Sequence, residues 1–287
     1  YFACGSGYVY AVRDTGSSYQ EKWKVQLGPG SIYGSPMVMD SLLYIGSLDD
    51  YLVCLRTSNG TKKWQTNLSG DIYSSTAVYN NTVYVGSYSD TLYALNGTDG
   101  TILRRYKTCG NLEAPAFLTW TTGLLCISTY VSPIPGSDTM YVINSSNFST
   151  YWKFADSGNL ARVWTSCFSL DDQKVYFGSD NNYLYCINLG SSSLVYKYQT
   201  GGYVQSSPLY WNGVVYFGSN DKKFYALNDN TQQPVAGWPF KSNNSITSSP
   251  ATSLQENIVV VGGTDGYIYA FYLSLIHISE PTRQAEI

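Results

Sequence analysis

Residues 83–94, Val-Tyr-Val-Gly-Ser-Tyr-Ser-Asp-Thr-Leu-Tyr-Ala, recur along the chain and decide its fold. Apolar residues alternate with polar ones on both sides of an acidic turn, which is typical of two half-buried β-strands joined as a hairpin. Every clear copy places its glycine eight residues before a small residue. The other clear copies begin at Leu43, Val175, Val215 and Val259.

The copies have a period of about 40 residues, which indicates a repeat architecture. A weaker copy begins at Leu125 and contains a six-residue insertion, and a partial copy opens the chain and ends at Val12. Successive glycines of the clear copies lie 40, 92, 40 and 44 residues apart, the second step covering two units. Those glycines are Gly46, Gly86, Gly178, Gly218 and Gly262.

Each unit is predicted to form four strands. The first strand follows a small-residue motif such as Ser206-Ser-Pro208, the next two form the hairpin, and the fourth carries Trp or Tyr. A single sheet of this size cannot cover its own faces, so the units must stack. We therefore predict an all-β fold: a β-propeller of four-stranded antiparallel blades with about seven repeat units, from a full protein of seven or eight blades. The first unit is expected to lack its opening strand and the seventh its last.

The two ends of the sequence shape the expected domain organisation. Residues 273–287 break the repeat and resemble a translated sequencing adapter, so we expect a non-native tail there and a propeller domain at 1–272, truncated at both ends. The chain's single histidine, His277, lies in that tail. Histidine-dependent catalysis and histidine metal sites are therefore not expected in 1–272.

Composition limits the partners that the chain can bind. Charged residues make up 13% of the 287 residues, aromatic residues 16%, and the net charge is −3, so no basic footprint for nucleic acid is expected. The apolar runs, such as 258–261, have the length of strands, and no transmembrane segment is expected. We expect protein or peptide partners.

The unit resembles the pyrroloquinoline-quinone-like, or quinoprotein-type, β-propeller repeat over nearly all of 1–272. That family has a docking motif of a small residue, Gly six positions later and Trp four positions after that, which Cys54, Gly60 and Trp64 match. The resemblance implies that this Trp packs between neighbouring blades. In other units, the aromatic residue lies two positions after the place that the motif assigns to Trp; these residues are Trp23, Tyr106 and Trp238. The residues expected to dock blades are Trp23, Trp64, Trp152, Tyr196 and Trp238.

The resemblance leaves two classes of function open. The family includes quinoprotein dehydrogenases, a bacterial outer-membrane assembly lipoprotein and lumenal unfolded-protein sensors. The dehydrogenases use adjacent cysteines and a Ca²⁺ site, whereas the six cysteines here are never adjacent. We therefore expect a non-catalytic binding or scaffold module without cofactor, metal or catalytic residues. The alternative is a fragment of a dehydrogenase that depends on pyrroloquinoline quinone (PQQ) with Ca²⁺.

Several residue sets remain open to more than one interpretation. The acidic hairpin turns, such as Asp221 and Asp265, are expected to stabilise turns, with a bound cation as the alternative. Cys54 and Cys186 are expected to be small core residues, and one disulfide is possible among Cys109, Cys126 and Cys167.

A candidate ligand or partner surface lies where the first strands begin. The position three residues before the Pro-type position of each first-strand motif carries several aromatic residues, and Leu112 and Thr247 are expected there in two units. Aromatic side chains at the start of the innermost strands suit a ligand or a peptide, although they could equally cover neighbouring blades. The candidate residues are Tyr33, Tyr73, Trp164 and Gln205.

Asn-x-Ser/Thr sequons favour an extracytoplasmic location, whether secreted, lumenal or periplasmic. All of them are expected to be exposed. The candidate glycosylation sites are Asn59, Asn67, Asn80, Asn96, Asn144, Asn147 and Asn243.

Overall fold

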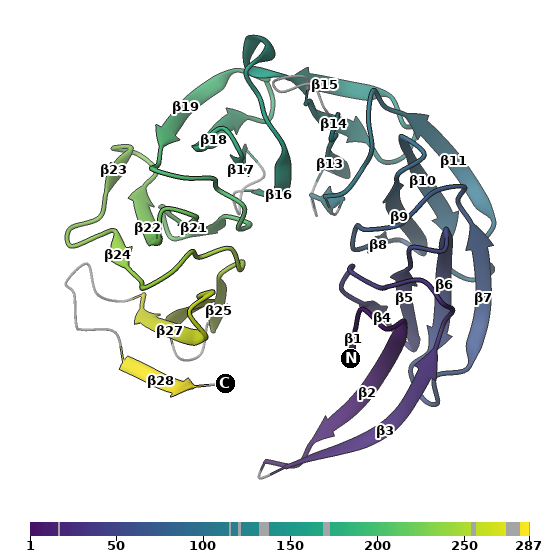
Figure 1. The fold of residues 1–287 in the computed structure, drawn as a ribbon. Helices are drawn as coiled ribbons and strands as arrows, with labels where there is room; N and C mark the ends of the chain where they lie inside the picture. Colours follow the sequence, from purple (N-terminus) through teal and green to yellow (C-terminus); the bar gives the residue numbers. More distant parts are fainter. Residues whose placement is uncertain are drawn as a thin grey trace. The chain divides into compact units, whose positions relative to one another are not determined.

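The computed structural model describes residues 1–16, 18–114, 116–119, 122–131, 138–168, 173–253, 257–273 and 282–286. These residues form seven antiparallel sheets, the blades of a β-propeller, which confirms the predicted fold (Figure 1). The one helical segment in the described residues is a 3₁₀ turn at Asp156–Gly158, and no described helix has the length and apolar character needed to cross a membrane.

The chain divides into two compact units. Unit 1 comprises Tyr1–Leu118, Gly123–Ile134 and Asp138–Lys153, and unit 2 comprises Thr119–Thr122, Pro135–Ser137 and Phe154–Ile287. Blades 1–4 lie in unit 1, apart from Phe154 at the end of β15, and blades 5–7 lie in unit 2.

Blades 1–4 follow the chain order, each strand pairing with the next. Blade 1 has three strands, as the sequence predicts. Their bounds are β1 (Phe2–Ala3), β2 (Tyr8–Asp14) and β3 (Tyr19–Gln26); β4 (Met37–Met39), β5 (Leu42–Gly46), β6 (Tyr51–Arg56) and β7 (Lys62–Asn67); β8 (Ala77–Tyr79), β9 (Thr82–Ser87), β10 (Thr91–Asn96) and β11 (Ile102–Lys107); β12 (Phe117–Leu118), β13 (Leu124–Ser128), β14 (Met140–Asn144) and β15 (Thr150–Phe154).

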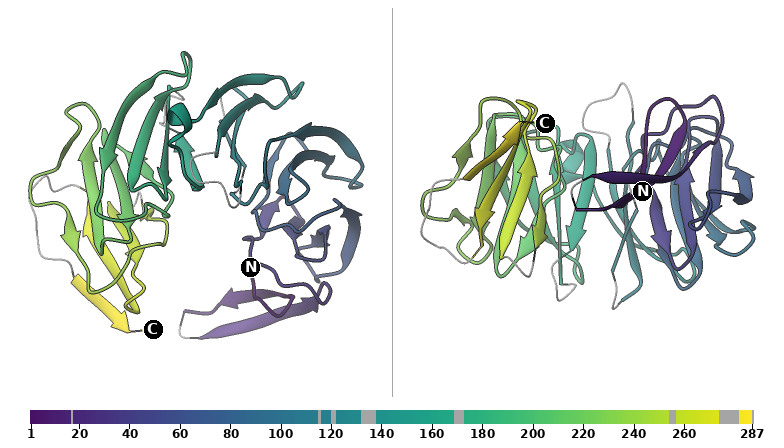
Figure 2. Two further views of the ribbon diagram at one scale, coloured as in Figure 1. Left: turned by 45° about the horizontal axis from the view of Figure 1, so that its top comes forward. Right: turned by 90° about the horizontal axis from the view of Figure 1, so that it is seen from below.

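Blades 5–7 repeat the pattern, with two variations. In blade 6, β22 pairs with two short segments, β23 and β24, in place of one outer strand. In blade 7 the outer strand is β28, so this sheet does not lack its fourth strand (Figures 1 and 2). Their bounds are β16 (Val163–Phe168), β17 (Lys174–Ser179), β18 (Tyr183–Asn188) and β19 (Leu194–Gln199); β20 (Leu209–Trp211), β21 (Val214–Ser219), β22 (Lys223–Asn228), β23 (Gln233–Pro234) and β24 (Phe240–Lys241); β25 (Ala251–Ser253), β26 (Ile258–Gly262), β27 (Tyr267–Tyr272) and β28 (Thr282–Glu286).

The hydrophobic core within each unit lies between successive blades. Val9 and Trp23 of blade 1 pack with Leu43 and Ile45 of blade 2, and similar clusters join blades 2 and 3, 3 and 4, 5 and 6, and 6 and 7. The prediction of half-buried strands is wrong for the middle strands. Nearly every residue of β9 and β10 is buried, because neighbouring blades cover both faces of the sheet.

The recurrent glycine marks the closest approach of one blade to the next. A Cβ atom on Gly86 would lie 2.5 Å from the Cβ of Leu112, and one on Gly46 would lie 2.1 Å from Ile72 Cγ2. Both distances are far below van der Waals contact, so a side chain at either position would separate the blades. This contact explains the glycine at these positions and at Gly178 and Gly218, whereas a Cβ on Gly262 would approach only Ser248 of its own blade.

Serine hydroxyls of the small-residue motif join successive blades. The Ser74 hydroxyl bonds both the amide and the carbonyl of Gly86, within its own blade. The next residue, Ser75, accepts a 2.8 Å hydrogen bond from the Ser35 amide of the preceding blade. Ser249 and Ser207 repeat this contact at 3.1 Å in unit 2. We call these amide–hydroxyl contacts the serine seam.

Candidate functional site

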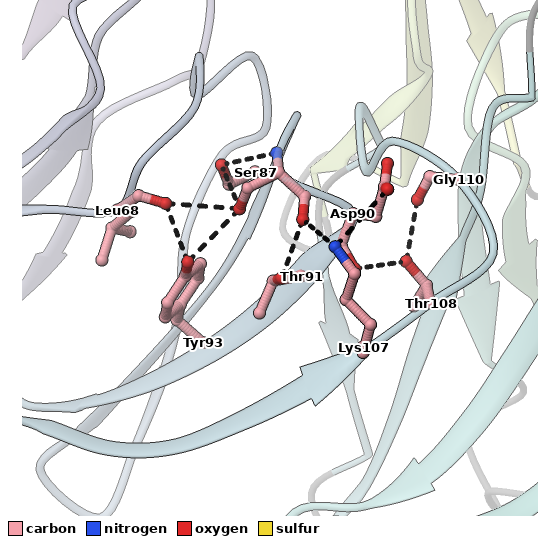
Figure 3. Close-up of polar contacts among 9 residues, drawn as sticks. Leu68, Ser87, Asp90, Thr91, Tyr93, Lys107, Thr108 and Gly110 are labelled. Atoms are coloured by element: carbon pink, nitrogen blue, oxygen red, sulfur yellow. Dashed lines mark hydrogen bonds and ion pairs between the residues drawn. The ribbon is translucent and has the colours of Figure 1, made fainter.

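Tyrosine hydroxyls form hydrogen bonds at the hairpin turns and between blades. The Tyr93 hydroxyl donates 2.8 Å to the carbonyl of Leu68, which belongs to the preceding blade (Figure 3). In unit 2, the hydroxyls of Tyr225 and Tyr269 donate to Asp221 and Asp265 at 2.5 and 2.7 Å. These carboxylates therefore stabilise their own turns. Among the described residues, no three His, Cys, Asp or Glu side chains gather as metal ligands.

In blade 3, the turn between β9 and β10 accepts several hydrogen bonds and one ion pair from residues at the end of β11. The Lys107 ammonium donates 2.7 Å to the Ser89 carbonyl and forms a 3.5 Å ion pair with Asp90 (Figure 3). The Thr108 hydroxyl is 2.9 Å from the Asp90 carbonyl and 2.8 Å from that of Gly110. The turn between β9 and β10 is thus tied to the end of the outer strand β11 and to Thr108, the residue that follows it.

Trp23 and Trp64 lie between blades of unit 1. Trp23 Nε1 donates 2.8 Å to the Thr57 carbonyl and Trp64 Nε1 donates 3.0 Å to the Gly97 carbonyl, each in the next blade. Their rings lie against Gly60 and Gly100, glycines with positive φ whose missing Cβ makes room for the indole. Each tryptophan therefore combines area burial with one directed hydrogen bond.

The other three expected docking residues have different surroundings. Trp152 is 8% exposed. Tyr196 donates its hydroxyl to Asp229 of the next blade. Trp238 follows β23 and packs in an aromatic cluster whose rings include Phe224 and Phe271 at 5.5 and 5.0 Å.

Two of the candidate surface residues form an aromatic stack in unit 1. Tyr33, 67% exposed, stacks on Tyr73 with ring centroids 5.5 Å apart and planes inclined by 22°. Tyr73 in turn contacts Tyr88 at 4.5 Å. We call these three residues the tyrosine ladder. Its exposed end, Tyr33, presents a flat aromatic face to solvent.

Carboxylates lie beside the tyrosine ladder. Burial and the nearby charges of Asp71 and Glu113 raise the pKa of Tyr73, and burial raises the pKa of Asp71 itself. Glu113, and not Leu112, occupies the position that matches Tyr73. The prediction for Leu112 is therefore wrong by one residue, and its side chain is 1% exposed. Leu112 corresponds to Ile72, because the backbone amide of each residue donates to the carbonyl of the serine that follows the recurrent glycine. The ladder therefore lies in an acidic environment.

The other two candidate residues meet in unit 2. Trp164 Nε1 and the Gln205 amide both donate to Asp180 Oδ1, at 3.0 and 3.1 Å. The guanidinium carbon of Arg162 lies 3.7 Å from the centroid of a Trp164 ring. Burial raises the pKa of Asp180, against the opposing influence of its two donors and of Arg162. Trp164 is therefore fixed in orientation by a polar network on one edge and a cation on one face.

Sequence reasoning did not connect the candidate side chains with the turn residues that contact them. Tyr88 and Asp180 both lie two residues after the recurrent glycine, and so does Asn220, which donates 3.3 Å to Gln205. Each one contacts the candidate residue of its own blade. The position two after the glycine is thus a signal that could have identified them.

Sequence comparison assigns the family. A family model described as "Outer membrane protein assembly factor BamB" matches residues 5–148 and 138–274. The chain belongs to this family. A search of curated proteins finds no match to the sequence.

Two solved structures share the fold of this BamB-family chain. The crystal structure of BamB from Moraxella catarrhalis has a TM-score of 0.74 at 18% identity, and the match covers 99% of this chain and 81% of that one. The computationally designed Ika8 protein has a TM-score of 0.71 at 13% identity, covering 86% and 73%. At these identities the likeness concerns the fold alone.

Cys54 and Cys186 of this BamB-family chain are not activated thiols. Cys54 and Cys186 are fully buried, and burial raises their pKa to about 11 and about 12. A thiol with so high a pKa is a poor nucleophile at neutral pH. Cys109 has a free thiol, so it does not pair with Cys126, and the side chain of Cys167 lies outside the described residues.

The sequons of this BamB-family chain differ in exposure. Asn96 and Asn144 are half-buried, contrary to the expectation that all seven are exposed. Their side-chain oxygens accept the Thr98 and Ser146 amides, which draws them into their turns. The exposed sequon residues are Asn59, Asn67, Asn80, Asn147 and Asn243.

Proposed function

We propose that the chain is a non-catalytic scaffold module that binds an extended segment of a partner protein on the tyrosine ladder. The observation that carries the proposal is the stack of exposed Tyr33 on Tyr73, which is itself supported by Tyr88. An exposed aromatic pair is accessible to a partner, and Tyr is among the residues that dominate protein interfaces.

The chemistry around the ladder defines the segment that would bind best. Asp71 and Glu113 give the aromatic faces a negative surrounding. Aromatic rings attract cations, and carboxylates add to that attraction. The preferred segment therefore carries basic side chains next to aromatic or apolar ones. In unit 2, Trp164 with Arg162 and Asp180 provides a separate polar contact surface.

The family description supports a location outside the cytoplasm. The matching family is described as an outer membrane protein assembly factor, and a role in assembly requires protein partners. The proposal includes no cofactor, because the cysteines are never adjacent as in the quinone-dependent enzymes, and no catalytic residue. Glycosylation of the exposed sequons depends on the host and is not needed for the function.

Peptide binding tests the proposal. The probe is an end-capped peptide of about nine residues in which Phe and Arg alternate with Thr, long enough to extend along one strand edge. We expect Tyr33→Ala with Tyr73→Ala to weaken binding at least about tenfold by calorimetry. Tyr19→Ala, which removes a 75% exposed tyrosine of β3 outside the ladder, is the matched control and should leave binding within about twofold. A folded double variant that binds as tightly as the wild type would remove the ladder from the proposal.

A further inference from the structure

Blade 3 departs from the docking pattern of its neighbours at one position. The residue paired with the small residue of the third strand is Trp23 opposite Ala11 in blade 1 and Trp64 opposite Cys54 in blade 2. In blade 3, Arg104 is opposite Ala94. Directly paired residues share a face of the sheet, so Arg104 takes the place of the docking tryptophan.

Arg104 replaces the hydrogen bond of the indole but not its volume. Its Nε donates 2.9 Å to the Ser146 carbonyl of blade 4, as the tryptophans donate to Thr57 and Gly97. The positive-φ glycine of the other turns is also replaced, by Phe148 with φ of +60°. The Phe148 ring packs against Tyr84 at 6.2 Å and is 7% exposed, so it fills part of the space from the opposite blade.

The remaining space is a pocket of about 370 Å³ within unit 1. Its size lies near the lower end of the range of about 300–1,000 Å³ for small-ligand sites. Aromatic and aliphatic walls combine with hydroxyl and amide groups. The lining residues are Tyr79, Asn80, Thr82, Tyr84, Ala94, Leu103, Arg104, Ser145 and Ser146.

The charge of the pocket is positive. Among the lining residues, all of them described, Arg104 is the charged one, and none is acidic. Its side chain is exposed, and its Nε is committed to Ser146. The two terminal nitrogens of a guanidinium form the fork that receives a carboxylate in a bidentate manner.

We propose that this pocket binds an aromatic carboxylate, with the ring on the walls formed by Tyr84, Ala94 and Leu103 and the carboxylate on Arg104. The ring fits because the same position in the two preceding blades holds an indole. The site shares no residue with the tyrosine ladder. The shared chemistry can come from a free aromatic acid or a C-terminal aromatic residue, or from an aromatic residue beside an acidic one inside a peptide.

Ligand-observed NMR with N-acetyl-L-tryptophan, up to about 10 mM, tests the proposal, since a ligand of this size binds weakly. We expect binding to the wild type, and a loss of about tenfold or more in Arg104→Gln. The amide N-acetyl-tryptophanamide should bind the wild type as weakly as the acid binds Arg104→Gln. The dipeptide N-acetyl-Trp-Asp-amide separates the sources: tighter binding than the free acid assigns the pocket to internal acidic segments, and weaker binding assigns it to free carboxylates.

Arg104→Trp provides a second, independent test. It restores the residue of blades 1 and 2, so we expect a folded protein whose pocket is filled and whose binding is abolished. Arg105→Gln is the matched control and should bind as the wild type does, because the Arg105 guanidinium lies over the Tyr93 ring and Arg105 does not line the pocket. No binding to the wild type, or equal binding to the wild type and both Arg104 variants, would overturn the proposal.

Discussion

Tyr196 donates its hydroxyl to Asp229 Oδ1 at 2.9 Å, and the other oxygen of the same carboxylate forms a 2.5 Å ion pair with Lys174. The Asp229 side chain is 4% exposed. This buried carboxylate accepts from the docking tyrosine of blade 5, as a backbone carbonyl accepts from the docking tryptophans of unit 1.

Removing that carboxylate should destabilise the protein strongly. Asp229→Ala removes the carboxylate that accepts from the Lys174 ammonium and the Tyr196 hydroxyl, and breaking a buried pair costs about 3 kcal/mol. The measurement is the free energy of unfolding from urea titration. Lys107→Met removes an exposed partner of Asp90 and serves as the control, with an expected loss of about 1 kcal/mol or less. Equal losses in the two variants would contradict the prediction.

Trp64→Ala should also lower the free energy of unfolding, by about 3–5 kcal/mol, because a buried indole and its hydrogen bond to Gly97 are both lost. Trp64→Phe keeps most of the ring area and should lose less. Tyr151→Ala on β15 is the control, since that tyrosine is 50% exposed. The same denaturant titration compares the three variants, and a Trp64→Ala protein as stable as Tyr151→Ala would show that the indole does not dock the blades.

Stability should fall at alkaline pH, and Cys54 should account for part of the fall. Its pKa is raised by burial from 9.0 to about 11. The folded state therefore keeps a proton that the unfolded chain releases, so stability is lost as the pH rises from about 9 to about 11. The loss from this thiol is about 2 kcal/mol at pH 11.

Cys54→Ala should fold normally, because Ala94 and Ala226 occupy the same position in blades 3 and 6. Its unfolding free energy should depend less steeply on pH than that of the wild type above pH 9, as measured by urea titration at several pH values. Slopes that coincide across this range would show that the thiol does not titrate with folding.

Removing the hydrogen bond that Trp164 donates to Asp180 should raise the pKa of that carboxyl group. Trp164→Phe keeps the ring beside Arg162 but removes the Nε1 donor to Asp180, one of the contacts that lower the pKa of that carboxyl. We expect the pKa of Asp180 to rise further in the variant, as followed by carbon NMR of the side-chain carboxyl. An unchanged pKa of Asp265, whose donors include Tyr269, is the internal control.

The fold could be predicted from the sequence because its determinants are local and repeated. The glycine, the turn and the small residue recur at fixed spacing, and each has a steric or hydrogen-bonding cause inside one blade or between two. The outer strand is different, since its register depends on the length of the preceding hairpin. Trp23 lies 12 residues after Ala11 and is paired with it, whereas Tyr106 lies 12 residues after Ala94 and is paired with Leu92.

The candidate site was only partly predictable for a related reason. Tyr33 and Tyr73 are found from the first-strand motif, but Tyr88 comes from a turn whose residue type varies among blades. The substitution of Arg104 for a tryptophan is visible in the sequence only after the register is known. A contact between two positions whose residue types vary among the blades produces no repeated sequence pattern, so it cannot be predicted from the repeat.

The serine seam has a consequence for how this architecture changes over time. Ser75 receives the amide of Ser35, and Ser249 receives that of Ser207, so each seam uses the same two atoms some forty residues apart. A duplicated or deleted segment of that length would leave matching donors and acceptors at the new junction. Unequal recombination within the gene would then produce variants with one sheet more or one fewer whose adjoining surfaces are already complementary.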